Sequence, residues 1–180
     1  MGILLGFTPF ILFTLLTSIS VSLALWIAFA AAFAISIRDF LHAKMVRVLD
    51  ASCLLLFALL AIYAGFIQPS LTVKAVRFIA DAAMLLIALG TMLLRNPFTL
   101  EYARDLVPSE EWPRPRFVRL NYFLTFFWAL SFAVMGAADG LAAYTKIFPF
   151  YLEILLSLAT LTFAIVVTVR LPLALTRRRR

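Results

Sequence analysis

The chain has 180 residues, of which 64% are hydrophobic and 14% are charged, and its mean hydropathy is +1.04. A soluble domain needs a largely polar surface, so this composition excludes one and indicates a single integral membrane domain over residues 1–180. The net charge of +7 does not indicate nucleic-acid binding, because the basic residues lie beside hydrophobic segments.

The first 37 residues carry no charged side chain and contain two hydrophobic segments, 3–17 and 20–38. Because they lack a basic start, we expect them to remain in the mature protein rather than to act as a signal peptide. Pro9 disfavours helix at Thr8. We therefore predict that 3–17 is a re-entrant or half-spanning segment, with a full sixth span as the alternative, and that 20–38 crosses the membrane.

Four more segments follow, each long enough for the roughly 20 helical residues that a hydrocarbon core of about 30 Å requires. They are 49–68, 72–94, 119–143 and 148–170, the last of which we expect to end before Pro172. The sequence thus predicts an all-α, polytopic bundle with five spans and a short N-terminal segment.

Residues 95–118 form the only long polar loop. Within it, Phe98, Tyr102 and Leu106 recur at intervals of four, which predicts a short amphipathic helix over 98–107 lying in the membrane interface.

Charge asymmetry predicts the orientation. If the loop is cytoplasmic, thirteen Lys and Arg residues face the cytoplasm and only three, Lys74, Arg77 and Lys146, face the other side. By the positive-inside rule, the loop and the C-terminus are then cytoplasmic, where the basic residues meet anionic lipid.

Ionisable residues within spans are costly and are candidate functional groups. Arg77 precedes Asp81 by four residues, which allows an ion pair along one helix. We predict one polar cluster near the outer face, which serves either as a proton or ion path or as a set of interhelical salt bridges; its residues are Arg77, Asp81, Asp139, Lys146 and Glu153, with Lys74 nearby. A second group is expected at the cytoplasmic side from Arg38, Asp39, Arg47 and Asp50.

Small residues at intervals of four predict close helix packing. One stripe comprises Ala24, Ala28, Ala32 and Ser36, and Gly136 with Gly140 forms a second. We expect both to be packing seams within one chain.

The residue inventory limits the chemistry. One histidine, His42, excludes bis-histidine haem ligation within this chain and a histidine-rich metal site, and one cysteine, Cys53, excludes an internal disulfide. No glycine-rich phosphate loop is present. We therefore assign no catalytic, cofactor-binding or metal-binding residue and expect a protein that is not an enzyme.

Several short motifs occur in a familiar order: Phe7-Thr8-Pro9-Phe10 in the first segment, Asn96-Pro97-Phe98 and Trp112 in the loop, and Asn121, Trp128 and Gly136 in the next span. This order resembles the intracellular septation protein A (YciB) family of bacterial inner-membrane proteins over nearly the whole chain. The resemblance implies a non-enzymatic protein of the bacterial cytoplasmic membrane, linked to septation and cell-envelope maintenance, that acts through membrane protein partners. Asn121, Trp128 and Gly136 would be its structural signature residues.

Three functional hypotheses follow. The first is an envelope or septation protein that docks partners through its loop, with Tyr102, Arg104, Trp112 and Arg116 as the docking residues. The second is a small transporter or channel for protons, ions or solutes that uses the acids within the spans. The third is an accessory subunit of a larger membrane complex.

Overall fold

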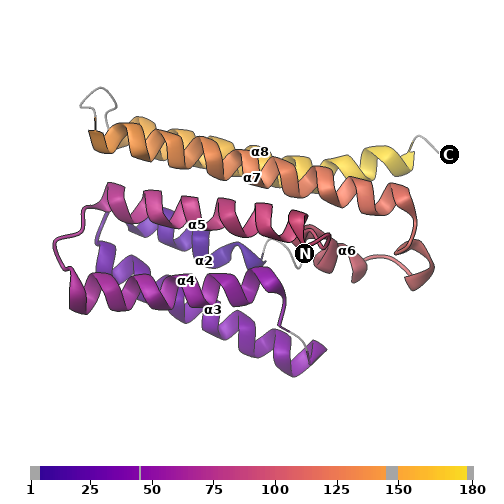
Figure 1. The fold of residues 1–180 in the computed structure, drawn as a ribbon, viewed down its shortest axis with the longest axis horizontal. Helices are drawn as coiled ribbons and strands as arrows, with labels where there is room; N and C mark the ends of the chain where they lie inside the picture. The colour runs from indigo at the N-terminus through magenta and orange to yellow at the C-terminus, as the bar shows by residue number, and fades with distance from the viewer. Residues whose placement is uncertain (1–4, 45, 145–149, 178–180) are drawn as a thin grey trace.

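The computed structural model describes residues 5–44, 46–144 and 150–177, which form seven α-helices and, within those ranges, no β-strand. Five helices are long and apolar enough to cross a bilayer, which confirms the predicted all-α multi-pass bundle. The long helices run side by side along one axis (Figure 1). We call the end that carries the short helix α6 the α6 end, and the opposite end the far end.

The first helix in the described range, α2 (Thr8–Leu16), is too short to span a bilayer. Its nine residues rise about 14 Å, less than half of the hydrocarbon core. It packs inside the bundle against α3 (Val21–Ala43). Pro9 lies in the first turn, where a missing N–H breaks no helical hydrogen bond, so the helix begins at Thr8 after all.

The next two spans agree closely with their predicted limits. Helix α4 (Val48–Ile62) continues as a π-helical turn (Tyr63–Ile67), and α5 (Val73–Leu93) follows. The Thr72 hydroxyl caps α5 by accepting a hydrogen bond from the backbone N–H of Ala75 at 3.3 Å.

The last two helices are longer than the sequence predicts. Helix α7 (Pro115–Tyr144) starts with a proline, which is well tolerated in a first turn. Helix α8 (Phe150–Arg177) continues past Pro172, so the predicted end before that proline is wrong. Membrane helices tolerate an internal proline because neighbouring groups and local adjustments satisfy the freed backbone carbonyl.

Helix α6 (Phe98–Arg104) is shorter than predicted and more deeply packed. It lies against α7 and α5, and its buried residues occupy more than one face: Phe98, Thr99, Leu100 and Tyr102. Leu106, expected on the apolar face of this helix, lies beyond its end and is 73% exposed. A 3-10 turn (Ser109–Glu111) completes the loop.

The helices form layers in which α5 links two pairs. Helix α7 lies beside α8 on one side of α5, and α4 lies beside α3 on the other (Figure 1). The seam predicted on α3 is confirmed, because Ala24, Ala28, Ala32 and Ser36 are all at most 6% exposed. Gly136 and Gly140 of α7 form the second predicted seam, where a Cβ would lie 3.4 Å from Asp81 Cβ and 3.3 Å from the Phe78 ring of α5.

Aromatic stacking fixes the N-terminal segment in the core. The Phe7 ring stacks on Trp128 of α7 with ring centroids 3.8 Å apart, and Phe98 of α6 meets Phe7 edge-on at 5.8 Å. All three side chains are at most 1% exposed. Phe7, the residue before α2, therefore packs between α6 and α7.

Phe7→Ala is expected to lower the free energy of unfolding by about 3 kcal/mol, the lower end of the range for a core phenylalanine, because detergent and lipid are themselves apolar. Thermal unfolding of the purified protein in detergent measures this. Leu15→Ala on α2, at a side chain that is 47% exposed, is the matched control and should change little. Equal effects of the two changes would contradict the packing role of Phe7.

Candidate functional site

Six polar side chains from three helices meet in a buried group near the far end, which we call the membrane-embedded cluster: Lys74, Arg77 and Asp81 of α5, Asp139 of α7, and Glu153 and Ser157 of α8. The structure thus brings together four of the five residues that the sequence singled out. The fifth, Lys146, lies outside the described residues.

Arg77 connects all three helices of this cluster. Its Nε donates to Asp139 Oδ2 at 3.1 Å, and its Nη2 donates to Ser157 Oγ at 2.7 Å. Its side chain is 3% exposed and that of Asp139 is 1% exposed. This buried ion pair lies in a region of low dielectric constant, where the attraction between its partners is stronger than in water.

Lys74 pairs with the acid of α8. Its Nζ lies 3.0 Å from Glu153 Oε1 and also donates to the backbone carbonyl of Ala142 at 2.8 Å. The Glu153 side chain is fully buried, whereas Lys74 is 30% exposed. The ammonium therefore neutralises Glu153 from the more open side of the cluster.

Asp81 has a different partner from the one its sequence position suggests. Arg77 pairs across the helices with Asp139, rather than along α5 with Asp81. Asp81 instead lies against α7 near Asp139, at Gly136, where a Cβ would be 3.4 Å from Asp81 Cβ. Sequence spacing gives the face of a helix but not the neighbour that faces it.

Sequence reasoning missed Ser157, the acceptor for Arg77. The sequence feature that could have identified Ser157 is its position four residues after Glu153, because this spacing places both side chains on one face of α8. Ser157 also donates to the carbonyl of Glu153 at 2.9 Å, which leaves its oxygen lone pairs available to the guanidinium.

The three signature residues of the resemblance all lie at helix contacts. Asn121 is 1% exposed at the start of α7, and its backbone carbonyl accepts from Thr99 Oγ1 of α6 at 2.8 Å. Trp128 donates from Nε1 to Thr168 Oγ1 of α8 at 3.0 Å. Gly136 faces Asp81. These positions serve packing between helices.

A second ionic group, the α6-end network, ties α6 to the start of α4 and the end of α3. Arg47, just before α4, donates to Asp39 of α3 and, at 2.5 Å, to Asp105 after α6. Its guanidinium also lies 4.6 Å from the centre of the Tyr102 ring. Of the four residues predicted here, Arg38 contributes only a long contact of 4.0 Å to Asp39.

Two further contacts complete the α6-end network. Glu101 accepts from the backbone N–H of Val48 at 2.9 Å and so caps α4 from another helix. Tyr102 Oη donates to Asp50 Oδ1 at 3.0 Å. Burial, and then the neighbouring Asp50 carboxylate, raise the pKa of Tyr102 above its usual value, so the phenol stays a hydrogen-bond donor.

The burial of Tyr102 corrects the predicted docking surface. This side chain is 4% exposed and belongs to the interior, so no partner reaches it in this fold. Of the other three predicted residues, Trp112 and Arg116 are exposed and Arg104 is half-buried, with a buried Nε. The Arg104 guanidinium lies 5.4 Å from the centre of the Trp112 ring, Trp112 is 39% exposed, and Arg116 is exposed at the start of α7.

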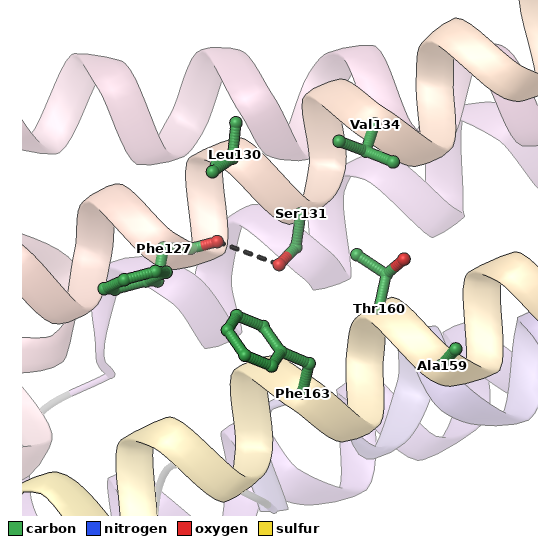
Figure 2. A pocket seen from close by; sticks show the side chains of 7 residues that line it. All are labelled: Phe127, Leu130, Ser131, Val134, Ala159, Thr160 and Phe163. Carbon is green, nitrogen blue, oxygen red and sulfur yellow. Dashed lines mark hydrogen bonds between the residues drawn. The ribbon is translucent and has the colours of Figure 1, made fainter.

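An open pocket of about 330 Å³ lies between α7 and α8, on the face away from α5 (Figure 2). Its lining is mostly apolar, with Phe127 and Phe163 at one side. Its two hydroxyls donate along their own helices, Ser131 to Phe127 O at 2.8 Å and Thr160 to Leu156 O at 2.7 Å. The pocket therefore suits an acyl chain or an apolar side chain better than a charged ligand.

Comparisons of the chain with protein-family models, with curated proteins and with solved structures found no match. The helices alone make it a multi-pass membrane protein. Its resemblance to the septation protein A family depends only on the motifs given above.

Arg77→Met is expected to lower the free energy of unfolding by about 3–5 kcal/mol, because it leaves the buried Asp139 carboxylate unpaired. Adding Asp139→Asn to this variant should restore most of the loss, since both buried charges are then gone. Thermal unfolding in detergent measures both effects.

Arg114→Met is the control, since Arg114 pairs with Glu111 at the surface and is 56% exposed. An Arg77→Met protein no less stable than this control, or a double variant less stable than the single one, would contradict the pairing.

Proposed function

We propose that this multi-pass membrane protein belongs to the bacterial cell envelope and acts without catalysis, by binding other membrane proteins during septation or envelope maintenance. The resemblance to the septation protein A family supports this role. The single structural observation that supports it is a rigidly held loop at the α6 end with arginine and aromatic side chains on its outside.

Contacts on the inner side of the loop hold it in place. Arg47, Glu101 and Tyr102 fix α6 to α3 and α4 through the contacts of the α6-end network. A loop that is ordered before binding loses less conformational entropy when a partner docks. We therefore expect a small entropy cost when a partner binds this loop.

The outside of the loop has the composition of an interaction surface. Tryptophan and arginine are the residues most often responsible for binding energy at protein interfaces. We define the docking surface as Arg104, Leu106, Trp112 and Arg116. Because the Arg104 guanidinium lies 5.4 Å from the centre of the Trp112 ring, the two side chains form one patch.

Trp112→Ala and Arg104→Ala are each expected to reduce co-purification of partner proteins in mild detergent by at least about tenfold, since each removes a hot-spot side chain of the kind that is worth roughly 2 kcal/mol or more. Arg38→Ala is the control, because Arg38 is charged and 49% exposed at the same end but lies outside the loop. Normal membrane insertion must accompany the loss. Unchanged co-purification in both loop variants would reject the docking role.

The proposed orientation places the docking surface in the cytoplasm. Leu106→Cys is expected to react with a membrane-impermeant thiol reagent in inside-out vesicles and not in intact cells, because its side chain is 73% exposed at the α6 end. Cys53 is fully buried in α4 and should give little background. Labelling of Leu106→Cys from outside intact cells would contradict the proposed orientation and place the α6 end on the opposite side of the membrane.

A further inference from the structure

Among the residues that the structure describes, the membrane-embedded cluster contains one acid more than it has cations. Asp81, Asp139 and Glu153 face Lys74 and Arg77. All of these residues except Lys74 are at most 4% exposed. An uncompensated buried charge costs several kcal/mol, so a cluster with a net negative charge is strongly disfavoured.

The pairing shows which acid is in excess. Arg77 forms an ion pair with Asp139 at 3.1 Å, and Lys74 forms one with Glu153 at 3.0 Å. Asp81 lies between α5 and α7 beside a carboxyl group that already has its cation. Of the three acids, it is therefore the one that has no counter-ion of its own within residues 5–44, 46–144 and 150–177.

Asp81 lies across the Gly136 seam from α7, in the same buried group as Asp139. Two carboxylates held near each other away from water repel one another, which favours a proton on one of them. With that proton on Asp81, the two cations balance the two remaining carboxylates, and the described part of the cluster is neutral.

Other polar atoms of the cluster have hydrogen-bonding capacity left. Arg77 Nη1, Asp139 Oδ1 and both carboxyl oxygens of Glu153 are buried and have no hydrogen-bond partner within the described part of the chain, although Glu153 Oε1 lies in the ion pair with Lys74. They provide a donor and three acceptors beside Asp81. Along the described helices no group of three or more acids, histidines or cysteines has the geometry of a metal site, and the Arg77 charge opposes a metal cation.

We propose that the membrane-embedded cluster is a proton-binding site, in which Asp81 carries one exchangeable proton beside Asp139. Release breaks the Asp81 O–H bond and passes the proton to water, which leaves two carboxylates near each other. Their repulsion favours separation of α5 from α7 at the Gly136 seam. The groups that face Asp81 during this exchange are Arg77 on its own helix, Asp139 on α7, and, through the same cluster, Lys74 and Glu153. Such a site is the first requirement of a proton-coupled carrier, and it is independent of the docking surface at the α6 end.

Infrared difference spectroscopy of the purified protein in lipid vesicles tests the proposal, because a protonated carboxyl group has its own C=O stretching band. The wild-type protein is expected to show this band at neutral pH and to lose it as the pH rises. Asp81→Asn should remove the band and keep the fold, since the amide is uncharged and can donate a hydrogen bond as the protonated acid does. Glu110→Gln in the exposed loop is the control and should leave the band unchanged.

Three results would overturn the proposal. The first is the absence of a protonated carboxyl band in the wild-type protein at neutral pH. The second is a band that Asp81→Asn leaves intact in a folded sample, as judged by thermal unfolding. The third is loss of the band on adding sodium at constant pH, which would mean that a metal cation replaces the proton.

Discussion

The ionic contact between Arg77 and Asp139 is the constraint on which the rest of this bundle depends. Helix α8 has few neighbours other than α7. Because the surrounding lipid is itself apolar, burial of apolar side chains contributes little to holding α8 in place. Hydrogen bonds and an ion pair attach α8 to its neighbours. Arg77 donates to Ser157, Lys74 pairs with Glu153, and the Trp128 indole donates to Thr168. In a low-dielectric medium these bonds are specific because an unpaired partner is costly.

The α6 end achieves the same result with different chemistry. There the decisive contacts combine aromatic stacking with charge, as when Phe7 stacks on Trp128 and Arg47 lies over Tyr102. Glu101 caps a helix to which it does not belong. The loop is thereby built into the bundle, and only its outer side is left for partners. The two ends thus differ: the α6 end keeps exposed side chains such as Trp112 on its outer side, whereas the far end buries its charged groups between helices.

Much of the site was foreseeable from rules that act on single segments. A charged side chain within a span is costly wherever it lies, so Arg77, Asp81, Asp139 and Glu153 were identifiable without coordinates. What pairs with what was not foreseeable, since it depends on helix rotation and offset. Arg77 bonds across to Asp139 because α5 and α7 approach closely at the small residues of α7. Tyr102 was predicted at the surface and is buried, because a periodic pattern gives an apolar face but not its depth.

The sequence by itself determined that this chain is a helical membrane protein with five spans, because helix length and hydropathy are properties of each segment and the bilayer imposes them one segment at a time. It also determined the close-packing stripe on α3, since a spacing of four residues defines a helix face. Only the tertiary structure decided that α2 stays within the bundle, that α6 is buried, and that Asp81 lies against α7 at Gly136 while Arg77 pairs with Asp139. Those outcomes depend on which faces meet, and that is set by the packing of all the helices together rather than by any one of them.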